Sequence, residues 1–457
     1  MHSPRAEHKR QAISGKWILG IDPGKERHTG ALLNPSGDPQ GRSFSFAVSA
    51  HGFRKTLPEA LRERMSAAEA DQLVVAVETS CNLWLTIAAY LHGQGYTVVL
   101  VNPLTTKHAR PLRDHDFSRT DPKDARLIAE NAQKGCYDPY RTFSPDIDAL
   151  HHLSLTRSKI LKDKNRTRLR LRAFMEQYFP EFLNAFDLES KTAFHLLRRA
   201  FLPRHFLALK PKQEHQELRR ISRGTHGADT VQRLQQWARD SIAVPVDAVL
   251  EVVLRQTLDG WLDQLELLQQ QLAAINEGMV ERARRYPAFE ILTSIPNIAG
   301  RLAACLIAEC RGLEPGVHPK QIERYAGLNL RLSESGQYVG HRRISHIGNA
   351  RLRCILYQMA VQTTQVVPFV RRRYLQRQLK GSGYRKNVVA SIAQLLKLIC
   401  TLINEQRPYE ERPAERAMIR RLERKLEPKE TPRRKHRRSV HRLGNPTRGK
   451  RPSRKAA

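Results

Sequence analysis

Short apolar runs and longer amphipathic stretches alternate over the first third of the chain. The apolar runs are bounded by turn residues, and the amphipathic stretches repeat apolar residues at the spacing of a helix. The pattern predicts strands at 17–22, 28–34, 42–48, 72–79 and 96–103, and helices at 53–65, 83–95 and 121–132. Three early strands joined by turns, followed by strands that alternate with helices, predict an α/β domain over residues 16–140.

The pattern becomes helical over residues 144–286, which we expect to form a coiled-coil connector. A long basic helix ends at Pro180, and the segment 191–243 is polar and irregular, so its role is open. A heptad pattern follows. Its members are Leu254, Leu258, Trp261, Leu265, Leu268, Leu272, Ile275 and Met279. The repeat fits both an intramolecular hairpin with the earlier helix and an intermolecular coil.

A second helical domain is expected over residues 289–409. Two apolar helices flank the turn Pro-Asn-Ile-Ala-Gly at 296–300, which predicts a helix-hairpin-helix-like element whose amides can face a phosphate. The stretch NVVASIAQLLKLICTLI at 387–403 predicts an amphipathic core helix. The expected fold class is therefore α/β plus all-α.

The charge of the chain points to a polyanionic partner. The 457 residues include 78 Lys or Arg and 45 Asp or Glu, which gives a net charge of +33. Nucleic acid is the default partner, because phosphate neutralisation dominates such binding. We expect a basic N-terminal arm at 1–15 and a basic disordered tail at 410–457, with eleven Lys or Arg and no acid from residue 431 onward.

Neither a membrane nor a disulfide framework is expected. No apolar run approaches the roughly 18 residues of a spanning helix, and the N-terminus lacks the apolar stretch of a signal peptide. The six cysteines are scattered without a CxxC pair, so neither zinc nor disulfides are indicated. We expect a cytoplasmic protein that associates with the nucleoid when it acts.

Four carboxylates could converge in the α/β domain. Asp22 and Glu78 end two strands, and Asp121 and Asp124 share one face of the helix that follows. Each residue alone has an ordinary explanation as a turn or cap residue. Together they predict an oxygen-ligand site for Mg²⁺, with two ions about 4 Å apart, suited to phosphoryl transfer.

The chain resembles a known family in these same segments. They are ILGIDPGKERHTGALLNPSG, VVAVETSCNLWLTIAAYLHGQGYTVVLVNPLTTKHAR and SRTDPKDARLIAENA. These look like the RuvC-like domain of the DEDD transposases, the bridge-RNA-guided insertion-sequence recombinases. The resemblance maps the family's D-E-D-D set onto Asp22, Glu78, Asp121 and Asp124. It implies an RNase-H/RuvC-like fold with magnesium at that site.

The second half resembles the C-terminal transposase domain of that family. The resemblance covers LTSIPNIAGRLAACLIAE, IERYAGLNLRLSESGQYVGHRRISHIGNARLRCILYQMA and VVASIAQLLKLI. It implies a serine nucleophile that joins covalently to DNA, with the two domains contributed by different protomers. Within LSESGQ, Ser335 is the first choice and Ser333 the second, because Glu334 separates two serines where the family run is often serine-rich.

Several basic residues near these two sites are candidates for binding nucleic acid. They are Lys107, Arg119, Lys123, Arg126, His341, Arg342, Arg343, Arg351 and Arg353. Arg119 stands where the family usually has Lys. The middle region is longer than expected for the family and the basic tail looks additional, so both could enlarge an RNA-binding surface.

Three functions remain in competition at this stage. The first is an RNA-guided transposase that binds donor DNA, target DNA and a structured guide RNA as a homodimer or homotetramer. The second is a RuvC-like, metal-dependent endonuclease such as a junction resolvase, without a serine intermediate. The third is a non-catalytic nucleic-acid-binding protein. The target sequence cannot be read from the chain, since a guide RNA would carry it.

Overall fold

The computed structural model of the chain describes residues 4–114, 120–331, 334–335, 338–339 and 343–426. At 4–6, 111–114, 331, 334–335 and 338–339 the backbone alone is described. Contacts between residues divide the chain into two compact units, Met1–Thr142 and Phe143–Ala457. The first unit is built on a β-sheet, and the second is mainly helical.

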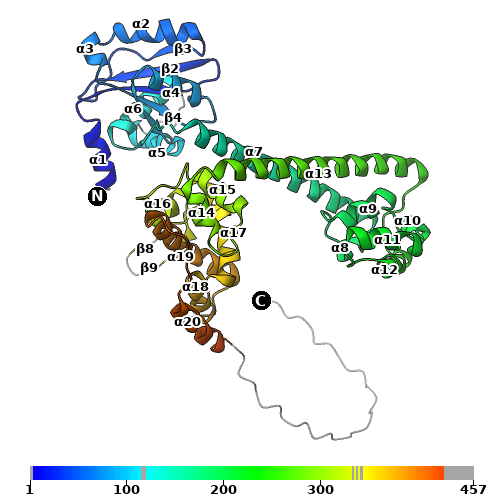
Figure 1. Cartoon of the computed structure of the whole chain (residues 1–457). Helices are drawn as coiled ribbons and strands as arrows, with labels where there is room; N and C mark the ends of the chain where they lie inside the picture. The colour runs from blue at the N-terminus through cyan, green and yellow to red at the C-terminus, as the bar shows by residue number, and fades with distance from the viewer. Residues whose placement is uncertain (1–3, 115–119, 332–333, 336–337, 340–342, 427–457) are drawn as a thin grey trace, which may run out of the picture. The chain divides into compact units, whose positions relative to one another are not determined.

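The first unit contains a six-stranded mixed sheet with the order β3-β2-β1-β4-β5-β6 (Figure 1). The strands are β1 (Trp17–Asp22), β2 (Arg27–Leu33), β3 (Phe44–Ala47), β4 (Leu73–Glu78), β5 (Thr97–Val101) and β6 (Asp138–Pro139). β1, β2 and β3 form an antiparallel meander, β1, β4 and β5 run parallel, and β6 pairs antiparallel with β5. This arrangement, in which the parallel strands are joined by helices, confirms the α/β class expected from the sequence.

Helices cover both faces of this sheet. The helical elements of this unit are α1 (Pro4–Ala12), the π-helical turn η1 (Gly52–Thr56), α2 (Leu57–Arg62), α3 (Ala67–Ala70), α4 (Trp84–Gly93), α5 (Pro103–Asp114) and α6 (Asp121–Gln133). Leu19 and Ile21 of β1 share a buried cluster with α2 and α4, whereas Ile18 shares one with α6. The alternation follows from the two-residue period of a strand. α2 and α6 accordingly lie on opposite sides of the sheet (Figure 1).

Two long helices of the second unit, α7 (Pro145–Tyr178) and α13 (Ala248–Ala283), pack against each other as an antiparallel hairpin (Figure 1). Two hydrogen bonds fix the register: Arg157 Nε donates to Asn276 Oδ1 at 2.7 Å, and Thr167 Oγ1 donates to Gln264 Oε1 at 2.9 Å. The heptad pattern is therefore used within the chain. Leu262 is fully buried where the pattern placed Trp261, which is only partly buried.

The segment between these two helices is a folded helical module, so the prediction of an irregular region at 191–243 is wrong. Its helices are α8 (Phe182–Ala185), α9 (Lys191–Arg199), α10 (Pro203–Ala208), α11 (Pro211–Ile221) and α12 (Ala228–Asp240). They enclose a cluster of aromatic side chains that includes Phe182 and Phe206. Each helix is short and separated from the next by Pro, Gly or Ser, so no long apolar period marks the segment.

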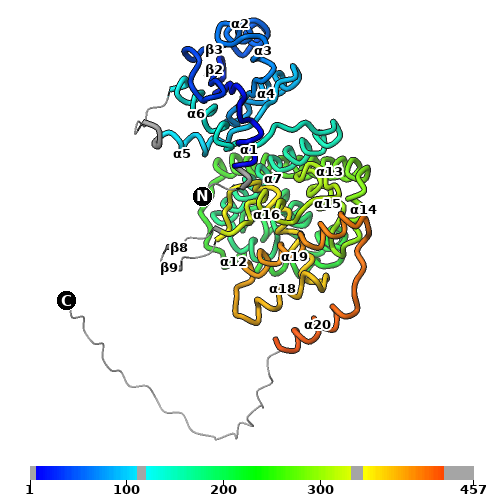
Figure 2. The backbone as a smooth tube through the Cα atoms, turned by 90° about the vertical axis from the view of Figure 1, so that its left-hand side faces the viewer, coloured from blue at the N-terminus to red at the C-terminus, as the bar shows by residue number. Residues whose placement is uncertain are grey.

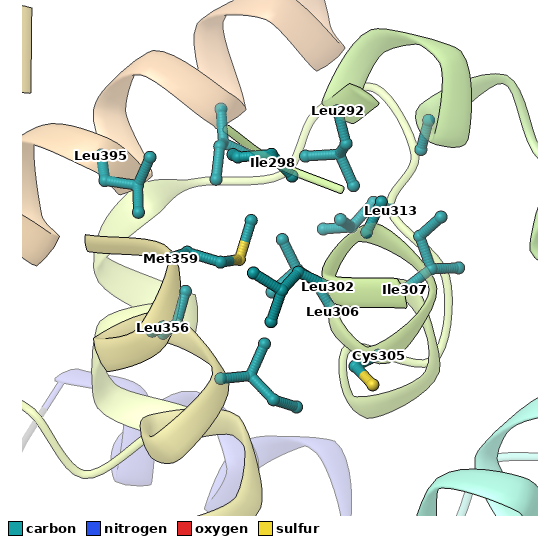
Figure 3. Close-up of a cluster of buried hydrophobic side chains, with 14 of the residues drawn as sticks. Leu292, Ile298, Leu302, Cys305, Leu306, Ile307, Leu313, Leu356, Met359 and Leu395 are labelled. Carbon is teal, nitrogen blue, oxygen red and sulfur yellow. The ribbon is translucent and has the colours of Figure 1, made fainter. Parts of the chain in front are cut away.

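The rest of the second unit is a helical domain around a large hydrophobic core (Figure 3). Its helices are α14 (Pro287–Thr293), α15 (Gly300–Glu309), α16 (Pro319–Tyr325), α17 (Ala350–Val366), α18 (Pro368–Gln378), α19 (Tyr384–Asn404) and α20 (Pro413–Arg424). Leu302 and Leu306 of α15 meet Met359 of α17 and Leu395 of α19 in this core (Figure 3). α18 and α19 lie side by side in two views (Figures 1 and 2). The all-α expectation for this region is confirmed.

Structure extends into both predicted basic arms. Residues 4–12 form α1, which Lys9 ties to the edge of the sheet through a 2.8 Å ion pair with Asp138. Within the predicted disordered tail, α20 packs on α18, where Arg371 donates to Glu423 at 2.5 Å. Ile419 of α20 is buried in this contact. Tertiary partners stabilise these short helices, and composition alone does not show such partners. Residues 427–457 lie outside the described part.

Within the described part of the chain, α19 is long and apolar enough by composition to cross a membrane. The 21-residue helix has 56% of its most apolar window buried inside the protein. Leu395, Leu396 and Ile399 belong to the hydrophobic core of the helical domain. α19 has the properties of a core helix, as its sequence predicts, although the apolar run is longer than the sequence reading allowed.

Candidate active site

The four carboxylates selected from the sequence belong to the first unit. Asp22 is the last residue of β1, and Glu78 is the last residue of β4. These strands are parallel neighbours with Ile21 opposite Val77, so both carboxylates stand at the same edge of the sheet. Asp121 and Asp124 occupy the first turn of α6.

A glycine in the central strand brings α6 close to this edge. A Cβ atom at Gly20 would lie 2.1 Å from the carbonyl oxygen of Ala125 and 2.7 Å from the amide of Ala129, so no larger residue fits without moving the helix. α6 begins after Thr120, which is extended, and Pro122 lies in its first turn. The backbone packing at Gly20 therefore sets where the two helical carboxylates stand.

The electrostatics of Asp22 show that the four groups act on one another. The pKa of Asp22 is raised to about 7, first by burial and then by the charges of Glu78, Asp124 and Asp121. Arg110, on α5, acts in the opposite direction. The structure thus brings four oxygen-donor side chains within electrostatic range around a half-buried aspartate.

Two of the carboxylates have close hydrogen-bond partners. Ser80 Oγ donates to Glu78 Oε2 at 2.6 Å, and Glu78 is buried. Arg110 donates from Nε and Nη2 to the two oxygens of Asp124, at 2.7 and 2.6 Å. Among the described residues, no three His, Cys, Asp or Glu side chains are arranged to hold a metal ion together. The four carboxylates are therefore close enough to affect one another, but among the described residues they are not positioned to coordinate one ion together.

The basic residues proposed beside this site differ in their contacts. Lys107 is exposed on α5, and Lys123 lies in the first turn of α6. Arg126 donates to Glu130 at 3.1 Å along α6, which leaves part of its guanidinium exposed. Arg119 lies outside the described residues.

The candidate serine lies in a small β-element of the second unit. β7 (Leu330–Arg331) pairs with β10 (Arg343–Ile344), and between them β8 (Glu334–Ser335) pairs with β9 (Tyr338–Val339). Ser335 is the last residue of β8, opposite Tyr338, and its backbone alone is described. Ser333, His341 and Arg342 lie outside the described residues.

The block RISHIGNARLR, which follows the serine, has several structural roles. Asn349 caps α17 by accepting hydrogen bonds from the amides of Arg351 and Leu352. Gly348, at φ 149°, has no room for a Cβ, which would lie 2.4 Å from the carbonyl oxygen of Tyr325. Arg353 donates to the carbonyl oxygen of Ala326 at 2.7 Å. Much of this block therefore shapes the start of α17.

A buried glutamate that the sequence reading did not select organises the same region. Glu309, at the end of α15, is fully buried and accepts hydrogen bonds from Ser154, Asn349 and Arg351 at 2.6–2.8 Å. Burial would raise its pKa, but these hydrogen bonds outweigh burial and lower it. Arg351 is thus held by an ion pair, while Arg343 is exposed.

Sequence reasoning also missed Arg110 and Ser80. Arg110 is one of many basic residues, and nothing in its neighbours marks it as the partner of an aspartate 14 positions later. Ser80 stands two residues after Glu78, a spacing that could have suggested a local hydrogen bond. Glu309 ends an apolar run, where a single acid is a useful sign of a buried ion pair.

Two family models that match the chain both describe transposases. A family model of the DEDD transposases of IS110, described as "Transposase", matches residues 19–180. A second, described as "Transposase IS116/IS110/IS902 family", matches residues 289–375, so that together they cover more than half of the chain. The chain is 22% identical over 423 residues to the insertion element IS110 uncharacterized 43.6 kDa protein of Streptomyces coelicolor, covering 86% of this chain and 96% of that protein. RuvC of Thermus thermophilus matches 27% of this chain and 99% of its own, with 17% identity and a TM-score of 0.20.

Proposed function

The chain belongs to the DEDD transposases of the IS110 family, and from this premise we propose that it cuts and rejoins DNA to move an insertion sequence. The observation that carries the proposal is the group of four carboxylates around Asp22, in the part of the chain that the DEDD model matches. DNA is the partner that such a transposase implies.

We propose that Asp22, Glu78, Asp121 and Asp124 bind two Mg²⁺ ions, because four carboxylates supply enough oxygen ligands for a pair of sites. The donor set fits a hard divalent ion. Burial and then the three neighbouring carboxylates raise the pKa of Asp22, and a bound cation would offset both effects. When bound, magnesium would stabilise the charge that develops on the reacting phosphate. The role of the chain is to hold the four carboxylates in place through β1, β4 and the packing of α6 at Gly20.

We further propose that Ser335 is the nucleophile, with Ser333 as the alternative. The serine hydroxyl would lose its proton and form an Oγ–phosphorus bond, while one bond between phosphorus and a sugar oxygen breaks. The released sugar hydroxyl takes up a proton, so one phosphodiester replaces another and rejoining can run the same exchange in reverse. Ser335 ends β8, opposite Tyr338 of β9, and lies in the part of the chain that the second family model matches, which supports this role.

A structured guide RNA and a homo-oligomer complete the proposal. Both rest on the family resemblance, and the net charge of +33 supports a large nucleic-acid surface. The test is an excision and insertion assay in cells, with the DNA flanking the gene present or deleted. We expect movement to require a structured non-coding segment beside the reading frame. Movement that persists after deletion of that segment would contradict RNA guidance and leave the transposase proposal intact.

The second unit contains a long stretch with basic and no acidic residues, which supports nucleic-acid binding. Between Ser335 and Asn404 the chain has twelve Lys or Arg and no Asp or Glu. Arg372 and Arg373 are exposed on α18, and Arg420 and Arg421 are exposed on α20, which packs against it. We call these four residues the α18–α20 surface. Its charge and exposure fit a contact with a phosphate backbone.

Charge reversal tests this surface. Arg372→Glu together with Arg373→Glu should weaken binding of a DNA duplex by about tenfold at physiological salt and reduce the slope of log affinity against log salt by about two, because two phosphate contacts are lost. Fluorescence anisotropy over a salt series measures both. The matched control reverses Arg233 and Arg239, which are exposed on α12. Equal losses in both double variants would show a general charge effect and no specific surface.

A further inference from the structure

The ion pair between Arg110 and Asp124 has more hydrogen bonds and less exposed side chains than the neighbouring pair on α6. Arg110 holds both oxygens of Asp124 in a two-bond fork, at 2.7 and 2.6 Å, and the side chains are only 16% and 14% exposed. Arg126 and Glu130, also on α6, form a single contact with an arginine that is 39% exposed. A guanidinium fork on a carboxylate is the strong form of such a pair.

The pair is a tertiary contact between two helices. Arg110 lies on α5 and Asp124 on α6, 14 residues later, so no helical neighbour relation creates it. The charge of Asp124 also raises the pKa of Asp22, as do the charges of Glu78 and Asp121. The charge of Arg110 lowers it. Arg110 thus supplies positive charge at the place where the carboxylates repel one another.

This position conflicts with metal binding by Asp124. A carboxylate whose two oxygens both accept from one guanidinium presents that face to the arginine, and a cation there would be repelled by the arginine charge. The fork therefore places the arginine charge where a cation bound to Asp124 would stand.

We propose that Arg110 is a latch on the metal site: it neutralises Asp124 in the metal-free protein and must release it before Asp124 can bind a divalent ion. The inference rests on the proposed function, since it takes the four carboxylates as metal ligands. Arg110 is in this sense a positioning residue, because it acts through Asp124. The energy needed to release the fork then lowers the affinity of the site for the ion.

Whether removal of Arg110 raises or lowers the affinity for a metal ion distinguishes the latch from a supporting role of the arginine. If Arg110 competes with the ion, Arg110→Ala should bind Mn²⁺, used as the probe, about tenfold more tightly than the unmodified protein, because one opposing charge is removed. If Arg110 instead orients Asp124 as a ligand, the same change should weaken binding. Arg110→Lys keeps the charge but loses the fork, so its affinity should fall between the two.

The experiment is calorimetric titration of the full-length protein with Mn²⁺ alone, in parallel with thermal unfolding with and without the ion. Without metal, Arg110→Ala should unfold at a lower temperature than the unmodified protein, yet gain more stability when Mn²⁺ is added. The matched control is Arg10→Ala, which removes one positive charge from an exposed pair with Glu7 in the same unit. Its Mn²⁺ affinity should equal that of the unmodified protein.

Each outcome decides between the latch and its alternatives. If Arg110→Ala binds Mn²⁺ more tightly than the unmodified protein, and Arg110→Lys has an affinity between the two, the latch is supported. If Arg110→Ala binds Mn²⁺ equally or more weakly, the latch is overturned and the proposed metal site remains. Asp124→Asn should weaken Mn²⁺ binding in either case. If neither the unmodified protein nor Arg110→Ala binds Mn²⁺, the proposed metal site fails and the latch fails with it.

Discussion

Replacing Asp121 by asparagine should lower the rate of DNA strand cleavage by about a thousandfold or more while the protein stays folded. The substitution keeps the shape of the side chain and removes the charge that a divalent ion needs, and the loss of several kcal/mol of transition-state stabilisation corresponds to this factor. Asp121 is exposed at the start of α6, so the change leaves the core untouched. Cleavage of a labelled element-end duplex with magnesium measures the effect.

The control for this prediction is Asp71→Asn. Asp71 is an exposed carboxylate of the same unit, at the end of α3, and its removal should leave cleavage unchanged. Binding of duplex DNA should persist in Asp121→Asn, which separates a chemical defect from a binding defect. Cleavage by Asp121→Asn at the unmodified rate would show that the carboxylates are not the reaction centre, and it would favour the non-catalytic function.

Ser335→Ala should abolish both strand exchange and the covalent protein–DNA adduct. Removing the attacking oxygen of a nucleophile leaves only the residual activity of the remaining groups, typically about a thousandfold or more below the unmodified rate. A denaturing gel of the protein with a radiolabelled duplex detects the adduct directly. Ser333→Ala, two residues earlier in the sequence, is the matched control and should retain the adduct.

The two serine variants also discriminate between the remaining functions. If Ser333→Ala loses the adduct and Ser335→Ala keeps it, the nucleophile is Ser333. If both variants still cut DNA and neither protein forms an adduct, a metal-dependent endonuclease such as a junction resolvase explains the site better. A transposase should lose activity both in Asp121→Asn and in the variant of its nucleophilic serine. A resolvase should lose activity in Asp121→Asn alone.

Much of the fold could be predicted because local pattern and tertiary role agree. The apolar runs around Leu19 and Val75 are short and bounded by turns, and both became buried strands of one sheet. The heptad pattern from Leu254 to Met279 likewise marked a buried helix face. The sequence left open whether its partner was the earlier helix or a second chain, because an apolar stripe specifies burial and does not specify which helix supplies the opposite face.

Regions where short helices share a core were harder to predict. The module between α7 and α13 is held together by aromatic residues such as Phe182 of α8 and Phe206 of α10, which belong to different short helices and meet only after folding. The Gly348–Asn349 pair shows the same limit at a smaller scale. Only the basic residues around this pair were selected from the sequence, while the structure uses Asn349 to cap α17 and Gly348 to let two backbone segments approach.

At the carboxylate site the sequence by itself determined the ligand types and their local geometry. Asp121 and Asp124 share one helical face because residues three apart in a helix are neighbours. Only the tertiary structure decided that α6 approaches β1 at Gly20 and that Arg110, from another helix, closes on Asp124. The physical reason is that burial and charge pairing depend on distances between segments, which a linear pattern of residues does not contain.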